Sequence, residues 1–174
     1  MSRTITVPLS EAGIKDAIKK LQEYKKWILE RANILVERVA REIATEAQAG
    51  FSSAFGDDLL SGDGRASDAT VTVETNGGTS IVRASGRDVV FVEFGTGVYH
   101  NTPAGSSPHP KGAELGLTIG SFGKGNGRKE VWGFYDGGEL RLTHGTPAAL
   151  PMYRAAKVVA GRIGEIAQEV FANG

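Results

Sequence analysis

Apolar residues recur at helical spacing through the first third of the chain. Between residues 28 and 47 the steps between apolar positions are 4, 3, 4, 4 and 4, which places them along one helix face. A shorter run follows Ser10, whose hydroxyl suits a helix N-cap, and Gly50 suits a C-terminal cap. We therefore expect amphipathic helices over about 10–22 and 24–49, joined by a kink. Their apolar positions are Ile14, Ala17, Ile18 and Leu21, then Ile28, Ala32, Leu35, Val39, Ile43 and Ala47.

Alternation of apolar and polar residues predicts two β-hairpins further along the chain. Residues 71–84 contain two alternating runs around an Asn-Gly-Gly turn, and residues 130–144 contain two around an Asp-Gly-Gly turn. Segment 88–94, DVVFVEF, is the strongest strand by propensity. Residues 2–9 alternate and then meet Pro8, which predicts an extended arm over 1–9.

The end of the chain predicts another amphipathic helix, whose start is marked by Thr146, Pro147 and Pro151. Helix, antiparallel hairpins and helix in this order indicate the α+β class. A length of 174 residues favours a single domain over 1–174. The expected buried face of the last helix is Met152, Ala155, Ala156, Val159, Ile163, Ile166 and Val170.

Glycine is unusually frequent, with 24 of 174 residues, and nine of them fall in a segment with few regular signals, 95–128. A connection of that length within a compact domain is usually functional or mobile, so we expect a long flexible loop here. A polar connector over 51–69 precedes the first hairpin. The residues expected to tether this connector to the core are Phe51, Phe55, Leu59 and Leu60.

Charge and cysteine content exclude several functional classes. The 20 basic and 20 acidic residues cancel, so a strongly basic face for DNA binding is not expected as the main property. The absence of cysteine excludes disulfides, thiolate metal sites and cysteine nucleophiles. No signal peptide or membrane helix is recognisable, so we expect a soluble protein that folds in the cytoplasm, without membrane partners.

The sequence contains no complete motif for a metal site, a phosphate-binding loop or a catalytic nucleophile. A metal site would need His100, His109 and His144 to converge with a carboxylate, and their spacing does not require this, so we expect exposed loop histidines, with His109 between two prolines. The run 120–129 lacks the Ser or Thr and the following helix of a P-loop. No nucleophile elbow is present. We therefore expect neither an enzyme nor a cofactor.

Basic residues of the glycine-rich loop are candidates for contact with DNA phosphates or an acidic partner: Lys124, Arg128 and Lys129. An alternative function remains open on these grounds. It is a small ligand- or nucleic-acid-binding module, or a loop-based enzyme, that uses the glycine-rich loop.

Two short segments carry a resemblance to a known family. VEFGTG at 92–97 alone indicates only a tight turn at the end of a strand, because Gly95 and Gly97 permit positive φ. Together with GTPAALPMYRAAKVV at 145–159, it resembles the paired signatures of the tail-component or tail-completion (head–tail joining) morphogenesis family of tailed bacteriophages. Met152 stands where the family pattern has an aromatic residue, and the intervening loop is longer. The motif residues are Glu93, Phe94, Gly95, Thr96, Gly97, Pro151, Met152, Tyr153 and Ala156.

The resemblance implies a structural virion protein, located in the neck or tail and assembled in the host cytoplasm. It implies a homo-oligomeric ring, with a hexamer favoured and a dodecamer as the alternative. The implied partners are connector, stopper or terminator, and tail-tube proteins, with transient contact to packaged DNA. It carries over no catalytic residue. Trp132, Phe134 and Tyr135 are candidate interface anchors, with the core of a strand as the alternative place for at least one of them.

Overall fold

The computed structural model describes residues 6–54, 68–95, 109–112, 114–115, 132–143 and 148–172. Within these ranges the chain forms three helices and two β-hairpins, which confirms the predicted α+β class. In order, they are α1 (Glu11–Ser53), β1 (Thr70–Asn76), β2 (Thr79–Ser85), α2 (Val89–Phe94), β3 (Trp132–Asp136), β4 (Glu139–Thr143) and α3 (Pro151–Ala172).

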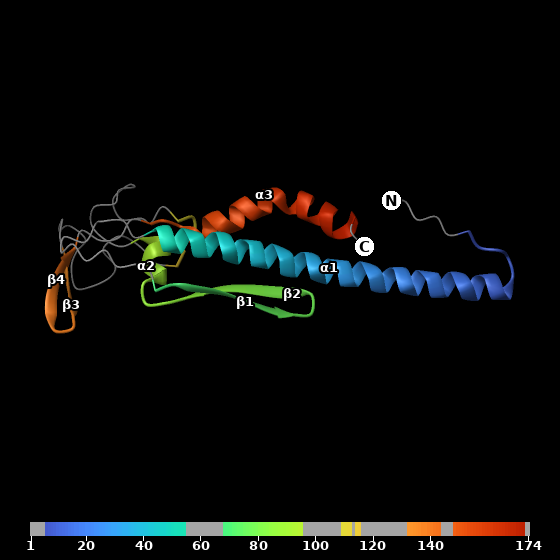
Figure 1. Cartoon of the computed structure of the whole chain (residues 1–174), viewed down its shortest axis with the longest axis horizontal. Coiled ribbons are helices and arrows are strands. Elements are labelled where there is room, and N and C mark those ends of the chain that lie inside the picture. Colours follow the sequence, from blue (N-terminus) through green and yellow to red (C-terminus); the bar gives the residue numbers. More distant parts are fainter. Residues whose placement is uncertain are drawn as a thin grey trace.

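Helix α1 is the axis on which the other elements are arranged (Figure 1). Helix α3 packs along one side of its C-terminal part, and the β1–β2 hairpin lies along the opposite side. The N-terminal part of α1 projects beyond both. Its apolar side chains are exposed there, with 50% of the surface of Ile14 and Ile18 and 55% of that of Leu21 accessible.

The two predicted N-terminal helices are one continuous helix of 43 residues, so the expected kink is wrong. No glycine or proline occurs between residues 14 and 49, and nothing in that sequence interrupts the backbone hydrogen bonds. At about 1.5 Å per residue, α1 is roughly 65 Å long. The predicted N-cap is confirmed, because the Ser10 hydroxyl accepts a hydrogen bond from the Gly13 N–H at 3.2 Å.

Gly50 does not cap α1, contrary to the prediction, because the helix continues to Ser53 and its C-cap is Ala54. Gly50 instead allows close approach of α3. A Cβ atom at Gly50 would lie 2.9 Å from the Cβ of Pro151, the first residue of α3. The glycine that resembles a helix-end signal is therefore a packing position, and this function depends on a contact about 100 residues away in the sequence.

Both predicted hairpins are present, as two separate two-stranded antiparallel sheets. The turn of the first has positive φ at Gly77 (57°), and the turn of the second has it at Gly137 (61°) and Gly138 (90°). Glycine adopts these values without the steric cost that a Cβ would bring, which is why Gly-Gly sets both turns.

The hydrophobic core consists of two clusters on the α1 axis. One joins the end of α1 to the hairpin and α2, with Phe51 and Val92 fully buried and Ala69 nearly so. The predicted burial of Phe51 is thus confirmed, although this residue belongs to α1 and not to the connector; Phe55, Leu59 and Leu60 lie outside the described residues. The second cluster joins α3 to α1. Its members are Val159, Ile166 and Val170 of α3, packed against Leu35, Val39, Ile43 and Phe171.

The buried face of α3 is narrower than predicted. Ala155, Val159, Ile166 and Val170 are buried, and Met152 is half-buried, in agreement with the periodicity. Ala156 and Ile163 were expected on the same face but are exposed, Ile163 by 45%. Among the described elements, α1 packs along the length of α3 and α2 touches only its start, so the apolar stripe of α3 is wider than the surface that these helices cover.

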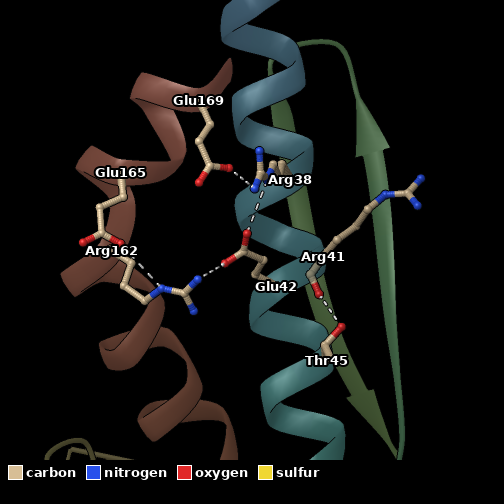
Figure 2. A network of polar contacts seen from close by, with 7 residues as sticks. All are labelled: Arg38, Arg41, Glu42, Thr45, Arg162, Glu165 and Glu169. Atoms are coloured by element: carbon tan, nitrogen blue, oxygen red, sulfur yellow. Dashed lines mark hydrogen bonds and ion pairs between the residues drawn. The ribbon is translucent and has the colours of Figure 1, made fainter. Parts of the chain in front are cut away.

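Ion pairs join α1 to α3 beside the second cluster (Figure 2). Arg38 binds Glu42 of its own helix at 3.4 Å and reaches across to Glu169 of α3, while Arg162 of α3 reaches Glu42 at 3.7 Å and Glu165 at 4.0 Å. The hydrogen bond with Glu169 raises the pKa of Arg38 above its ordinary value. Single exposed pairs contribute little to stability, so we ascribe to this network mainly the register of α3 on α1.

The prediction of a strand over 88–94 is wrong, because Val89–Phe94 forms helix α2. The Val92 N–H donates to the Asp88 carbonyl at 2.9 Å, which is the spacing of an α-helical turn. The three valines and two phenylalanines of α2 disfavour helix by roughly 0.5 kcal/mol each, or roughly 2.5 kcal/mol together. Complete burial of the Val92 side chain beside Phe51 contributes roughly 1.5–3 kcal/mol, so this one tertiary contact offsets most or all of the local preference.

The predicted arm and loop fall largely outside the described residues. Residues 6–10 precede α1 without a regular element, so no strand occurs in the described part of the arm. Of the glycine-rich loop 95–128, the structure describes only Gly95, residues 109–112 and residues 114–115. The Pro8 carbonyl accepts a hydrogen bond from the Ser10 N–H at 2.8 Å, and this turn leads the chain into α1.

Asp68, just before β1, binds the turn before α2, and this contact makes the unfolding free energy depend on pH. Its carboxylate accepts hydrogen bonds from the Arg87 backbone N–H at 3.0 Å and from the Arg87 Nε at 3.2 Å. The backbone bond, followed in importance by the side-chain bond, lowers the pKa of Asp68 below its ordinary value of 3.8. The stabilisation is therefore complete above that value and is lost as the pH falls through the lower, folded-state pKa.

We expect the carboxyl carbon of Asp68, followed by NMR, to titrate below the ordinary aspartate range. We also expect Asp68→Asn to reduce the loss of unfolding free energy on acidification below pH 3.8. The amide cannot be deprotonated, so the variant has no proton linkage at this position. If the variant and the wild type lose the same unfolding free energy on acidification, the Arg87 contact does not persist in solution.

Candidate functional site: the junction of α2 and α3

Helix α3 starts without a capping side chain of its own. Pro151 is its first residue, and Leu150 before it occupies the N-cap position. Leucine has no side-chain acceptor for the free N–H groups of the first turn, and caps are normally Ser, Thr, Asp or Asn. Leu150 also has φ of 55° and is buried, a conformation that costs a non-glycine residue roughly 1–2 kcal/mol. The start of α3 therefore depends on groups from elsewhere.

Glu93 of α2 supplies the missing cap. Its Oε2 accepts a hydrogen bond from the Met152 N–H at 2.8 Å, and its Oε1 accepts one from the Tyr153 N–H at 3.0 Å. These are the second and third residues of α3, the two positions that a local N-cap side chain serves. The carboxylate is buried, and its charge lies at the positive end of the α3 dipole.

His109 closes the other side of the carboxylate. Its Nε2 lies 3.2 Å from Glu93 Oε1, and its Nδ1 accepts a hydrogen bond from the Lys111 N–H at 3.0 Å. An Nδ1 that accepts a bond carries no proton, so the ring is the neutral tautomer with its proton on Nε2. His109 therefore donates to Glu93, which makes three donors around one buried carboxylate.

An aromatic cluster covers this hydrogen-bonded centre. The His109 ring lies with its centroid 4.3 Å from that of Phe94 and 5.3 Å from that of Tyr153, in tilted and edge-on geometries. Such arrangements are favourable for aromatic rings. His109, expected as an exposed loop residue, is only 8% exposed, so that prediction is wrong.

Gly95 allows the end of α2 to touch the segment before α3. The Ala149 N–H donates to the Val92 carbonyl at 2.9 Å, which brings the two backbones together. A Cβ atom at Gly95 would lie 2.9 Å from the Ala148 nitrogen, and φ at Gly95 is 79°. Both the contact distance and the backbone conformation require glycine.

We expect Gly95→Ala to reduce the free energy of unfolding by about 2 kcal/mol, because the variant adds backbone strain of about 1–3 kcal/mol. Urea denaturation followed by circular dichroism measures the change. Gly161→Ala is the matched control, since a Cβ at Gly161 meets no atom within 4 Å. This exposed position in α3 should gain about 0.5–1 kcal/mol from the better helix former. Equal effects at the two positions would contradict the close approach.

A shallow hollow lies beside the junction, between the end of α1 and the start of α3. Its volume is about 350 Å³, and small residues line most of it, including Gly50, Ala149 and Ala155. Glu46 and Arg154 add one charge of each sign. Among the described residues no group of three or more His, Asp or Glu side chains is placed to hold a metal ion.

The structure brings together most of the motif residues inferred from the sequence. Glu93, Phe94 and Gly95 meet Met152 and Tyr153 at the junction. Pro151 packs on Gly50, and Ala156 points to solvent one turn further along α3. The remaining candidates lie outside the described residues: Thr96, Gly97, His100, Lys124, Arg128, Lys129 and His144.

Sequence reasoning missed the contributions of His109 and Leu150. The Pro-His-Pro context indicated a constrained histidine, but no local pattern indicates its carboxylate partner. Of the expected aromatic anchors, Tyr135 is 76% exposed, while the side chains of Trp132 and Phe134 lie outside the described set.

Comparison with known proteins finds no matching family model, no similar curated protein and no similar solved structure. None of the helices in the described ranges combines the length and apolar character needed to cross a membrane.

Proposed function

We propose that this protein is a structural component of a tailed-phage virion, which completes the tail or joins it to the head as one subunit of a ring. The observation that carries the proposal is the contact between the two segments that resemble the tail-completion family. Glu93 of the first accepts hydrogen bonds from the backbone of the second at 2.8 and 3.0 Å. Two short matches separated by about 50 residues thus form one physical unit, which accidental matches would not be expected to do.

The chemistry of the junction supports an assembly role without catalysis. The Glu93 carboxylate is buried and takes three donors from the protein itself, and His109 is held in one tautomer by Lys111. A general base must reach the proton that it removes from a substrate. These side chains are instead directed at each other and at the first turn of α3.

The exposed apolar stripe of α1 supports self-association. Helix α3 reaches along α1 as far as Trp27, which contacts Phe171, and on the N-terminal side of that contact Ile14, Ile18 and Leu21 are at least half exposed. A contiguous apolar patch of this kind is unusual on a monomer and is typical of an interaction surface. In the proposed ring, neighbouring subunits cover it, and connector, stopper or tail-tube proteins contact the ring faces.

The oligomeric state in solution tests the proposal. Size-exclusion chromatography with light scattering, followed by negative-stain electron microscopy, should show closed rings, with six subunits favoured and twelve as the alternative. Virions assembled without the protein should accumulate as free heads beside finished tails. A chain that stays monomeric at high micromolar concentration, or particles that are fully infectious without it, would rule the proposal out.

A further inference from the structure

The β1–β2 hairpin has two long edges that no other strand of the described chain pairs with. Helix α1 packs against the hairpin and contacts both strands (Figure 1). Isolated two-stranded sheets are marginally stable in water, and unpaired edges are ready templates for another strand.

The register shows which backbone groups point outward. Asn76 pairs with Thr79 across the two-residue turn, so alternate pairs from there, such as Glu74 with Ile81, are hydrogen-bonded within the hairpin. The intervening residues direct their N–H and C=O groups away from the partner strand. On β1 these are Val71, Val73 and Thr75, and on β2 they are Ser80, Val82 and Ala84.

The β1 edge already binds a strand-like group at its start. The side-chain amide of Gln48 donates to the Ala69 carbonyl at 3.0 Å and accepts from the Val71 N–H at 2.9 Å. One amide that bonds the carbonyl of Ala69 and the N–H of Val71 reproduces the bonds of a parallel neighbouring strand at this point. It leaves the outward groups at Val73 and Thr75 for a partner.

Among the described residues, the β2 edge has little of the usual protection. Its seven residues, TSIVRAS, contain no proline and a single charged side chain, Arg83, and its pairing with β1 runs without a bulge. Natural edge strands commonly carry prolines, several charges or bulges to prevent pairing with other chains. A regular seven-residue edge with one charge, which a carboxylate on a neighbouring strand would neutralise, is therefore open to a partner.

We propose that the outer edge of β2 pairs antiparallel with β1 of a second copy of this chain, at Val73 and Thr75, so that the hairpins form a continuous sheet between subunits. This inference rests on the proposed ring and names one of its interfaces. Repetition of the same head-to-tail contact closes a ring when the rotation permits it.

Charge favours this partner over a two-fold contact between β2 strands. Arg83 on β2 and Glu74 on β1 are exposed on the hairpin, 3.7 Å apart within one chain. A neighbouring β1 brings a second glutamate to the Arg83 side, whereas a neighbouring β2 brings a second arginine. The side chains of Val73 and Val82 lie on the half-buried face of the hairpin. An added strand therefore also extends this apolar face.

Proline at outward-pointing positions tests the edge pairing, because it blocks an edge without removing a backbone hydrogen bond of the hairpin. Ser80→Pro blocks the β2 edge and Thr75→Pro blocks the β1 edge. The two variants are matched, since each loses the same 2.9 Å hydroxyl contact between Thr75 and Ser80. By light scattering we expect each variant alone to be monomeric and their equimolar mixture to form a 1:1 dimer.

The outcomes separate this inference from the proposed ring. If the wild-type chain forms rings and both folded variants do so as well, the edge pairing is wrong and the ring stands. If Thr75→Pro alone forms dimers, the contact is a two-fold one between β2 strands and the head-to-tail pairing is wrong. A monomeric wild type removes the ring and this interface together.

A cysteine experiment covers the case in which a proline variant does not fold, as judged by circular dichroism. The chain has no native cysteine, so single substitutions report only on contacts between copies. A mixture of Arg83→Cys and Glu74→Cys chains under mild oxidation should yield mostly the mixed disulfide dimer. A predominance of Arg83→Cys homodimers, or a random distribution, would contradict the pairing of β2 with β1.

Discussion

Replacement of Glu93 by alanine is expected to lower the free energy of unfolding by about 3 kcal/mol. The substitution removes the acceptor of the Met152 and Tyr153 N–H groups and of His109 Nε2. Loss of the N-cap, which already includes the Met152 and Tyr153 donors, costs about 0.5–2 kcal/mol, and the buried His109 donor left without an acceptor costs about 1–3 kcal/mol. Together these give about 1.5–5 kcal/mol, and we expect a loss near the middle of that range.

Chemical denaturation measures the loss, and two further variants interpret it. Glu93→Gln keeps one oxygen acceptor and removes the charge at the positive end of the α3 dipole, so its loss of unfolding free energy should be about half of that in Glu93→Ala. Glu165→Ala removes an exposed glutamate from α3 itself and should change stability by less than about 0.5 kcal/mol. Similar losses for Glu93 and Glu165 would show that the cap contributes nothing specific.

Hydrogen exchange adds a local measurement for the same variant. The Met152 and Tyr153 amides are protected by Glu93 alone, because residues of the first helical turn have no partner within their helix. In Glu93→Ala their exchange should accelerate by more than that of amides in the middle of α3. Uniform acceleration would instead indicate global destabilisation, without a specific role for the cap.

The elements that the sequence predicted correctly are those whose signals are local. Ser10 caps α1 through a residue three positions away, and the glycines at 77 and 137–138 set their turns by their own φ angles. The apolar spacing of α3 likewise follows from helix geometry, so Val159 and Ile166 were predicted as buried and are buried.

The wrong predictions concern residues whose environment comes from distant parts of the chain. Segment 88–94 has strand propensity, but Val92 is buried beside Phe51 and Glu93 is held by α3, which fixes the segment as a helix. Gly50 resembles a helix end, but it accommodates Pro151. Ala156 shares the apolar spacing of α3 but faces away from α1, and spacing alone does not give the width of the partner surface.

The candidate site could be predicted only in part, for the same reason. The resemblance indicated that segments 92–97 and 145–159 are both significant, but it gave no reason for their pairing. The structure supplies one: Leu150 leaves α3 without a local cap, and Glu93 replaces it. The contribution of His109 requires a fold in which the loop returns to α2, which no periodicity in the sequence encodes.

The cap and the first core cluster hold the same elements together. Val92 lies in the core beside Phe51, while the next residue, Glu93, binds the start of α3. Met152 both donates to Glu93 and packs against the Phe51 cluster. Any change that loosens one of these contacts is therefore expected to weaken the other.

Phe51→Ala is expected to produce the largest loss of unfolding free energy, about 3–5 kcal/mol, because removal of this fully buried ring leaves a cavity in the core. Chemical denaturation measures this loss. The control is Val158→Ala, at a half-exposed position on α3, which should change the unfolding free energy by less than about 0.5 kcal/mol.

The double variant of Phe51→Ala and Glu93→Ala tests the coupling between the core and the cap. Because the two contacts share Val92 and Met152, the double loss should be smaller than the sum of the single losses by at least about 0.5 kcal/mol. Strict additivity would mean that the buried carboxylate and the core below it stabilise the junction independently.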